Sequence, residues 1–380
     1  MLKTLRVALV TDYMTDLGGS DRLLLSILKV FPQADIYTSI FEKQKYPHLK
    51  NKVYTTFLQA FIFRKLLRRV VSILTPLAFE SLNLMNDYDL VISLSAGASK
   101  GVITSTKQKH ISILLTPPRH LWDLETNVRA SRFKDVIHFF SNTLSTYMRI
   151  WDQTAVKRID DIITISKYIK DKVKKVYKRD SKVIYPGISS FWYEKNKEEL
   201  TQEYKAIKNK YSIPDNFFLV VSRLYDYKRV DWAIRSCLIN NKTLVIVGAG
   251  PDLPYLKSLA NGQSNIKFLG KLDDNSLRVL YNNAQALLFC GVEDYGFVPI
   301  EAMACGCPVL AFNEGGVTET VVNNKTGYLF SSLEELSEIV KKDVWEAYNK
   351  RDCIERSKLF TEEKFLDTFT KYLNTTYEKE

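Results

Sequence analysis

The chain has few cysteines and no long hydrophobic run. Its 380 residues include five cysteines, and their spacing forms neither a disulfide framework nor a zinc motif. Cys305 and Cys307 flank a single glycine too closely for a relaxed disulfide, so we expect buried thiols and no metal site. No stretch of about twenty apolar residues predicts a membrane-spanning helix, and the N-terminus shows no signal-peptide cleavage site. We therefore expect a cytoplasmic protein.

Acidic residues are scarce in the first half of the chain. Residues 1–190 carry a net charge of +14 and residues 191–380 a net charge of −3, which together give the overall +11. A basic half attracts nucleic acid, anionic lipid or a phosphorylated substrate. Because zinc-finger spacing, an aromatic RNA-binding string and a recognition helix are all missing, nucleic acid is the least favoured of these partners.

The most basic segment is F-I-F-R-K-L-L-R-R-V-V-S-I-L-T-P-L-A-F, residues 61–79. Arg64, Lys65, Arg68 and Arg69 recur there at three-to-four spacing among apolar residues, which is typical of an amphipathic helix at a membrane surface. A core helix with a solvated basic face explains the same pattern equally well. A second basic run, residues 167–182, favours an ordinary solvated helix face.

Short β-branched runs alternate with helical segments along the whole chain. The expected strands are residues 6–11, 35–39, 90–94, 110–115, 162–165, 217–221, 243–247, 266–269, 286–289 and 308–311. Such alternation predicts parallel sheets with crossover helices. The series is interrupted near residue 190, so we predict two Rossmann-like α/β domains, 1–190 and 191–360, that face each other across a cleft. Phe360, Phe365, Phe369 and Leu373 stand at helical spacing, so we expect the C-terminal segment, residues 361–380, to dock as a helix.

The segment E-D-Y-G-F-V-P-I-E, residues 293–301, places two glutamates around a glycine at the start of a probable helix. Gly296 allows a ligand to approach the backbone, and the amides of Phe297 and Val298 would favour an anion at the helix N-terminus. The alternative is a pair of ordinary solvated carboxylates, Glu293 and Glu301, before and within a helix. The core-like run A-M-A-C-G-C-P-V that follows favours a site for a polyhydroxylated ligand.

Two cations follow the expected strand 217–221. Arg223 and Lys228 lie in the loop beyond its carboxyl end, where they could hold a diphosphate and stabilise the charge of a leaving group. Either residue alone would more often be a surface charge.

Glycine pairs follow two other strands. Gly248 and Gly250, in V-G-A-G-P, lack the third glycine of a dinucleotide fingerprint, so we assign them to a backbone turn near a nucleotide. Gly18 and Gly19 follow the first strand and precede a helix, which suggests a loop with free amides at a binding site. A plain strand-to-helix turn is the alternative for Gly18 and Gly19.

These motifs together resemble a family 4 retaining glycosyltransferase of the GT-B fold. The resemblance covers G-G-S-D-R at 18–22, S-R-L-Y-D-Y-K-R-V-D at 222–231, V-G-A-G-P at 247–251, and E-D-Y-G-F-V-P-I-E-A-M-A-C-G-C-P-V at 293–309. It continues in G-G-V-T-E-T-V and K-T-G-Y-L-F. The segment L-T-P-P-R-H-L-W-D at 115–123 is similar to the subgroup of O-antigen mannosyltransferases that use GDP-mannose.

The resemblance implies a role for each motif. Arg223 and Lys228 would bind the donor diphosphate, Glu293 the transferred sugar and Glu301 the ribose, with the amides after Gly296 assisting the phosphate. It also implies a metal-independent hexosyltransferase that retains the anomeric configuration, without a protein nucleophile and without a cofactor beyond the donor. The C-terminal helix would cross back to the N-terminal domain.

The implied substrates are a nucleoside-diphosphate sugar, with GDP-mannose favoured, and a glycan or lipid-linked acceptor. The expected process is synthesis of cell-surface polysaccharide or glycolipid, with the protein peripheral on the inner face of the cell membrane. Arg119 and His120 are expected on the acceptor or sugar side.

The chain departs from the subgroup at two positions. Leu115 stands where a histidine usually precedes T-P-P-R, and Ile165 stands where an asparagine usually precedes Ser166. Leucine forms no side-chain hydrogen bond to a sugar. A non-catalytic nucleotide-sugar-binding subunit is therefore an alternative, and a nucleotide-sugar epimerase of similar architecture is another.

Overall fold

The computed structural model describes residues 2–61, 68–84, 87–123, 135–193 and 197–377. By its internal contacts, the chain divides into two compact units. Unit 1 comprises residues 1–186 together with 365–380, and unit 2 comprises residues 187–364. The domain boundary predicted at residue 190 lies close to the change from unit 1 to unit 2 after residue 186. Most of the expected C-terminal segment, residues 365–380 of 361–380, groups with unit 1.

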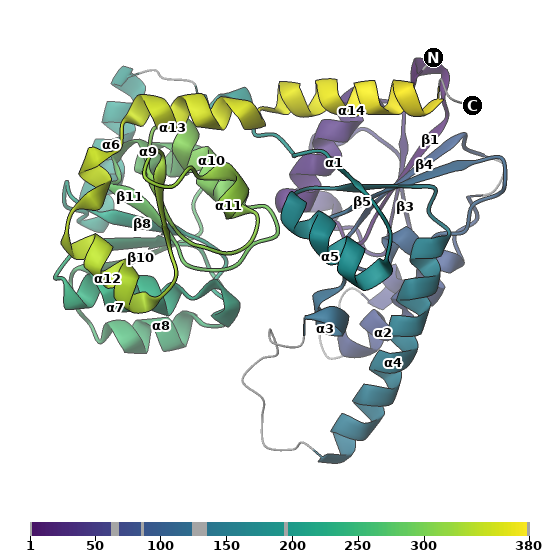
Figure 1. Ribbon diagram of the computed structural model, residues 1–380, viewed down its shortest axis with the longest axis horizontal. Coiled ribbons are helices and arrows are strands. Elements are labelled where there is room, and N and C mark those ends of the chain that lie inside the picture. Colours follow the sequence, from purple (N-terminus) through teal and green to yellow (C-terminus); the bar gives the residue numbers. More distant parts are fainter. Residues whose placement is uncertain (1, 62–67, 85–86, 124–134, 194–196, 378–380) are drawn as a thin grey trace. The chain divides into compact units, whose positions relative to one another are not determined.

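Unit 1 is built on a parallel sheet. Its strands are β1 (Val7–Thr11), β2 (Asp35–Thr38), β3 (Val53–Thr55), β4 (Leu90–Ser95), β5 (Lys109–Leu114), β6 (Asp161–Thr164) and β7 (Lys182–Val183). They run in the order β3-β2-β1-β4-β5-β6-β7, and all their pairings are parallel. The strands β1 and β4 are buried along their whole length, because both faces of the sheet carry helices (Figure 1).

The helices of unit 1 lie between its strands, except α14, which follows unit 2 in the sequence. They are α1 (Gly19–Val30), α2 (Arg68–Glu80), α3 (Arg119–Trp122), α4 (Asp135–Lys157), α5 (Lys167–Tyr177) and α14 (Glu362–Tyr377). Short 3-10 turns are η1 (Leu2–Thr4), η2 (Lys43–Lys45), η3 (Phe57–Phe61) and η5 (Ser99–Gly101). In α5, Ile169, Val173 and Tyr177 are buried, and three of the four exposed positions carry lysine, as expected for a solvated basic face.

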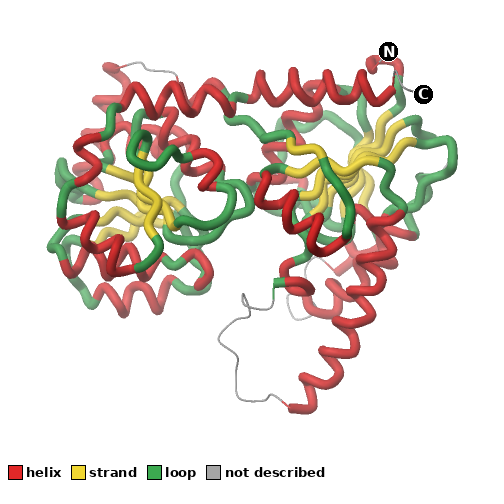
Figure 2. Tube along the Cα trace, viewed as in Figure 1, coloured by secondary structure: helices red, strands yellow, loops and turns green. Residues whose placement is uncertain are grey.

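Unit 2 repeats the same design. Its strands are β8 (Phe218–Val221), β9 (Leu244–Val247), β10 (Ile266–Gly270), β11 (Ala286–Phe289), β12 (Val309–Phe312) and β13 (Gly327–Phe330). They form a parallel sheet in the order β10-β9-β8-β11-β12-β13. Figure 2 shows helices on both faces of this sheet. The two parallel-sheet α/β domains predicted from the alternating pattern are therefore confirmed.

The helices of unit 2 are α6 (Lys197–Tyr211), α7 (Val230–Ile239), α8 (Leu253–Ala260), α9 (Asp274–Asn283), α10 (Phe297–Ala304), α11 (Val317–Thr320), α12 (Leu333–Lys341) and α13 (Lys350–Ser357). The 3-10 turns are η7 (Ser190–Tyr193), η8 (Asp226–Lys228), η9 (Val344–Ala347) and η10 (Lys358–Phe360). One apolar core joins the sheet to α7 and α12, with Phe218 and Trp345 packed edge to face at 4.5 Å between ring centroids. All five cysteines are buried as thiols, as predicted.

In each sheet the strand order reverses at one point, which lies between β1 and β4 in unit 1 and between β8 and β11 in unit 2. In open α/β sheets, ligands bind outside the carboxyl ends of the strands at such a switch point. The fold therefore marks the ends of β8 and β11 as the place to look for a site in unit 2.

The expected basic helix over residues 61–79 is only partly described. Arg64 and Lys65 lie outside the described residues, and α2 begins at Arg68 and Arg69, of whose side chains nothing is described. Farther along α2, Ile73 and Leu77 are exposed. Within the described part of the chain, we find no helix with the length and apolar character needed to cross a membrane.

The helix α14, drawn in yellow in Figure 1, carries the phenylalanine pattern seen in the sequence. Phe365, Phe369 and Leu373 are buried, and the rings of Phe365 and Phe369 stack with 5.5 Å between their centroids. Phe360, the first residue of the pattern, ends η10, and residues 365–380 group with unit 1.

Candidate functional site

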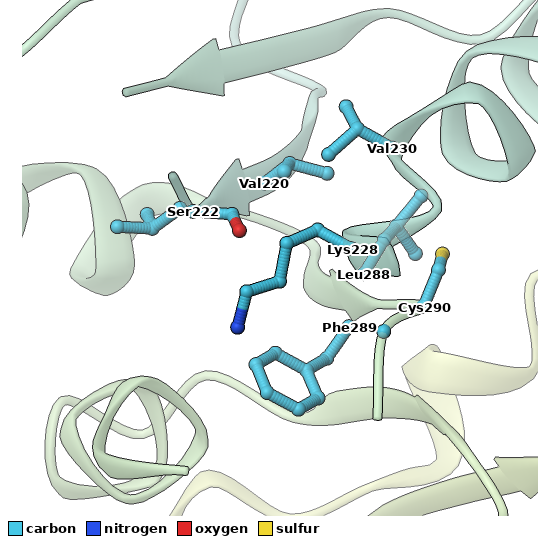
Figure 3. A pocket seen from close by; sticks show the side chains of 9 residues that line it. Val220, Ser222, Lys228, Val230, Leu288, Phe289 and Cys290 are labelled. Carbon is cyan, nitrogen blue, oxygen red and sulfur yellow. The ribbon is translucent and has the colours of Figure 1, made fainter. Parts of the chain in front are cut away.

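A small pocket lies at the switch point of unit 2, where β8 and β11 end. It is lined by Val220, Val221, Ser222, Lys228, Val230, Leu288, Phe289, Cys290 and Gly291. Apolar side chains from the two strands form most of its wall, and Lys228 reaches between Ser222 and Phe289 (Figure 3). The pocket thus combines an apolar wall with one strongly basic group.

The ammonium of Lys228 is paired with Glu293. Lys228 is the last residue of η8, and only 4% of its side chain is exposed. Its Nζ forms an ion pair with Oε1 of Glu293 and lies 4.8 Å from the centre of the Tyr227 ring. The structure therefore brings together two residues that are 65 positions apart in the sequence and were both predicted for the site.

Arg223 lies in the loop between β8 and η8 and is exposed. One of its terminal nitrogens donates to the Tyr227 hydroxyl at 3.4 Å, and its guanidinium lies 5.7 Å from the ring centre of Tyr225. Tyr227 contacts both Arg223 and Lys228, so it joins the two predicted cations. Nothing in the sequence distinguishes Tyr227, because tyrosines are frequent in this chain.

The loop that carries Glu293 is held by Gly315 and Gly316, the two glycines of G-G-V-T-E-T-V. The amide of Gly316 donates to the carbonyl oxygen of Glu293 at 2.8 Å, and Glu293 and Gly315 form an isolated β-bridge. A Cβ on Gly315 would lie 2.4 Å from the carbonyl oxygen of Glu293, and one on Gly316 would lie 2.6 Å from that of Asp294. Both glycines are therefore needed for the two loops to approach each other.

The helix α10 begins directly after this loop. Its N-cap is Gly296, with φ +90°, and no side chain caps the first turn. The chain therefore enters the helix through a conformation that favours glycine, and the N-terminal end of α10 at Phe297 and Val298 has the positive end of the helix dipole. Pro299 fits within this first turn because its missing N–H has no partner there.

Glu301 lies inside α10 and is 97% buried, since only 3% of it is exposed. The Tyr281 hydroxyl, from α9, lies 3.5 Å from its Oε2. A buried carboxylate needs such partners. The structure thus gives Glu301 a protein contact, and a contact of Glu301 with a ribose stays a prediction.

Gly248 and Gly250 follow β9 and lie against the loop that carries Arg223. Gly248 has φ +141°, and a Cβ there would lie 1.8 Å from the carbonyl oxygen of Ser222. A Cβ on Gly250 would lie 2.1 Å from the carbonyl oxygen of Leu224. The structure therefore explains both glycines by close backbone packing beside Arg223.

Hydrogen bonds to Asp21 stabilise the Gly18–Gly19 loop of unit 1. The Gly18 amide donates to Oδ2 of Asp21 at 3.0 Å, and the Tyr46 hydroxyl donates to Oδ1 of the same carboxylate at 2.6 Å. The expected free amide is therefore wrong for Gly18, because Asp21 occupies it. Gly19 begins α1.

Arg119 and His120 lie in the single turn α3, which is firmly anchored. Trp122 donates from Nε1 to Oδ2 of Asp152 at 2.8 Å, and Asp152 is paired with Lys100 at 2.6 Å. The side chains of Lys100 and Asp152 are both fully buried, and the Tyr177 hydroxyl also donates to Asp152. Leu115, just beyond β5, donates its amide to Ser95.

Sequence reasoning missed Asp12, the residue after β1. Its carboxylate accepts the amides of Ala96, Gly97 and Ser99 at 2.7, 2.8 and 2.8 Å. Asp12 thus ties the ends of β1 and β4 together at the switch point of unit 1. A single aspartate after a strand is too common a signal to select from sequence. Among the described residues, no three His, Cys, Asp or Glu side chains gather as a metal site would require.

Comparison with known proteins finds similarity over the part of the chain that contains the site of unit 2. Residues 201–358 match the family model "Glycosyl transferases group 1". The O-antigen chain mannosyltransferase RfbU of Salmonella typhimurium is 30% identical over 173 residues, which are 43% of this chain and 45% of that protein. The alpha-1,3/1,6-mannosyltransferase ALG2 of Dictyostelium discoideum is 29% identical over 236 residues, 53% of this chain and 56% of that protein.

The curated relatives are thus matched over only about half of their length. Similarity to solved structures covers nearly the whole chain. The structure of HepE from Anabaena, in complex with UDP and glucose, matches 97% of this chain and 100% of its own with a TM-score of 0.71 and 18% identity. The predicted GT-B fold is confirmed.

Proposed function

We propose that the chain is a retaining glycosyltransferase, on the premise that residues 201–358 match the family model "Glycosyl transferases group 1". It moves a hexose from a nucleoside-diphosphate sugar to a glycan or lipid-linked acceptor. The observation that carries the proposal is the ion pair of Glu293 with Lys228, which lines the pocket at the ends of β8 and β11.

This pair suits a charged donor. A diphosphate that enters the pocket brings negative charge to Lys228, whose ammonium is then shared between the phosphate and Glu293. Arg223 adds a second, exposed cation, and the N-terminal end of α10 adds its dipole. These groups stabilise the charge that develops on the leaving diphosphate, so they lower the barrier to cleavage of the sugar–phosphate bond.

Glu293 is proposed to contact the transferred sugar, and Glu301 the ribose of the nucleotide. Attack of the acceptor hydroxyl occurs on the face from which the diphosphate leaves, and the leaving phosphate takes the proton of the acceptor. Such a mechanism retains the anomeric configuration and needs neither a protein nucleophile nor a metal. Arg119 and His120 in unit 1 are proposed to act on the acceptor or sugar side.

Mannose is the favoured sugar and GDP-mannose the favoured donor. The names of RfbU and ALG2 describe mannosyltransferases, and the first of them acts on the O-antigen chain. By this analogy the chain acts in the synthesis of a cell-surface polysaccharide or glycolipid. The basic N-terminal half, with Ile73 and Leu77 exposed on α2, supports work at the inner face of the cell membrane.

A second candidate function is binding of the nucleotide sugar without catalysis. It is favoured by Leu115, which replaces a hydrogen-bonding residue with an apolar one. In that case the donor would stabilise the protein without being consumed.

The test is a panel of GDP-mannose and UDP-, ADP- and dTDP-sugars, with thermal stabilisation and donor hydrolysis as the two measurements. We expect one donor to stabilise the protein and to be hydrolysed. Glu293→Gln should lower its turnover by about 10²-fold or more and change nucleotide affinity only a few-fold, because its role concerns the sugar. Glu346→Gln, at an exposed site in η9, is the matched control and should behave as the wild type.

Wild-type turnover of the Glu293→Gln variant would contradict the site. Stabilisation by a donor, with no hydrolysis and no transfer to any acceptor, would favour the binding-only function. In that case Leu115→His should remain inactive as well.

A further inference from the structure

The residue after Lys228 has an unusual backbone. Arg229 has φ +49° and ψ +39°, in the left-handed region, and it is the N-cap of α7. A side chain with a Cβ rarely adopts this conformation, because the Cβ crowds the following carbonyl oxygen. Something must therefore hold Arg229 there.

Two aromatic rings contact the Arg229 side chain and stabilise it in this position. The guanidinium carbon of Arg229 lies 5.0 Å from the ring centre of Trp232 and 4.5 Å from that of Phe312. The two rings stand nearly perpendicular, at 88° and 5.7 Å apart. Trp232 belongs to the first turn of α7, and Phe312 ends β12. The cation–π contacts thus fasten the start of α7 to a neighbouring strand of the sheet.

We call Arg229 and the two rings around it, Trp232 and Phe312, the aromatic clamp. Backbone contacts link this clamp to the pocket. The Arg229 amide donates to the carbonyl oxygen of Asp226 at 2.9 Å, and the Trp232 amide donates to that of Arg229 at 3.0 Å. On the other side, a Cβ on Gly291 would lie 2.7 Å from the Cα of Lys228. The backbone of Lys228 is therefore held between Gly291 of the strand end and the clamped Arg229.

We propose that Arg229 is a positioning residue for nucleoside-diphosphate binding: its clamp between Trp232 and Phe312 fixes the turn that directs the Lys228 ammonium into the pocket. This inference rests on the proposed function, in which Lys228 contacts the diphosphate. Arg229 itself touches the rings, and Figure 3 shows Lys228 as the residue of this turn that reaches into the pocket.

The experiment measures nucleotide affinity calorimetrically for the wild type and for Arg229→Ala. The probes are GDP and GMP, with UDP and UMP as a second pair, because only the diphosphates carry the phosphate that Lys228 is proposed to hold. We expect Arg229→Ala to weaken diphosphate binding by about tenfold and monophosphate binding by less than about threefold. Arg235→Ala is the matched control, since Arg235 lies on the same helix and is exposed. It should bind all four nucleotides as the wild type does.

Two further variants separate positioning from folding. Arg229→Gly removes the clamp but adopts a positive φ without strain, so it should recover thermal stability relative to Arg229→Ala while diphosphate binding stays weak. Arg229→Lys keeps a cation near the rings and should restore part of the diphosphate affinity.

The outcomes distinguish the two levels of the proposal. Wild-type diphosphate affinity in both Arg229→Ala and Arg229→Gly, with the wild type binding normally, would overturn the positioning role and leave the proposed function intact. Equal losses for mono- and diphosphates would also overturn it, because they would indicate general damage to the site. A wild-type protein that binds no nucleotide of either pair would overturn the proposed function and this inference with it.

Discussion

A buried ammonium such as that of Lys228 is stable only with a compensating charge. Moving an isolated cation away from water is unfavourable, and Glu293 offsets this cost by forming an ion pair with Lys228. Because Glu293 is more exposed than Lys228, with 30% of its side chain accessible, an incoming anion can share the lysine without first burying a new charge.

His110 presents the opposite case, since it is buried without a counter-charge. It lies in β5, with its Nε2 2.9 Å from the hydroxyl of Ser93, and it is fully buried. Burial, and to a lesser extent the positive charge of Arg158, lowers the pKa of His110 from 6.5 to about 4. The unfolded chain therefore takes up a proton at a higher pH than the folded chain does.

This difference predicts a stability change with pH. The contribution of His110 is fully present above pH 6.5 and is lost as the pH falls from about 6.5 towards 4. Between pH 7 and pH 5 we expect the free energy of unfolding to drop by about 2 kcal/mol through this residue. Urea unfolding of the wild type and of His110→Gln at both pH values measures it.

The His110→Gln variant should lose this part of the pH dependence. His48→Gln is the control, because it makes the same substitution at an exposed histidine. Equal pH dependence in the wild type and in His110→Gln would show that His110 is not the cause.

At the scale of elements, the loops after β8 and β9 pack closely because the loop after β9 has glycines where the two backbones meet. Gly248 has a φ of +141° and leaves no room for a Cβ beside Ser222. Gly248→Ala should therefore lower the free energy of unfolding by roughly 3 kcal/mol or more, since strain and a backbone clash add together. It should also weaken nucleotide binding, because the displaced loop carries Arg223.

Gly262 provides the comparison for this variant. Its φ is also positive, +70°, but no atom lies within 4 Å of a Cβ placed there. Gly262→Ala should lose only about 1 kcal/mol, from the strained backbone alone. Chemical denaturation of both variants measures the difference, and equal losses would mean that the contact with Ser222 does not matter.

The strands also show which elements could be predicted from the sequence. Strands such as β1 and β11 are uninterrupted apolar runs, so their positions followed directly from the pattern. The strands β3, β7 and β13 were missed: β7 has two residues, β3 has three, and β13 begins with glycine, so none contains a run long enough to stand out.

The candidate site was predictable only in its residue types. Lys228 is predicted from its place beyond a strand end and Glu293 from the segment 293–301, but their ion pair depends on how two distant loops fold. The left-handed backbone of Arg229 was not predictable, because the rings that hold it come from α7 and from the end of β12. Propensities of single residues carry no information about such a contact.

At the scale of the whole molecule, the excess positive charge lies in the N-terminal half of the sequence. If this half binds anionic membranes through the basic segment, replacing Arg64, Lys65, Arg68 and Arg69 together by glutamine should abolish binding to vesicles that contain anionic lipid, because each cation near such a surface contributes about 1 kcal/mol. Sedimentation with the vesicles measures the bound fraction.

A control removes the same charge elsewhere. Lys167, Lys174, Lys175 and Lys178 are exposed on or directly after α5, and their replacement by glutamine should leave most of the binding in place. If both quadruple variants lose binding equally, the attraction comes from net charge and the basic segment is not the anchor.

Unit 1 is discontinuous along the chain, because α14 returns to it after unit 2. The chain therefore places Phe369 and Leu373 in the core of unit 1 only after residues 187–364 have been synthesised. At ordinary rates of translation this delay is roughly 10–40 s. During that time the first 186 residues lack their last helix, and unit 2 can fold before unit 1 is complete. The unit that carries the pocket at the ends of β8 and β11 is thus the first that can mature on the ribosome.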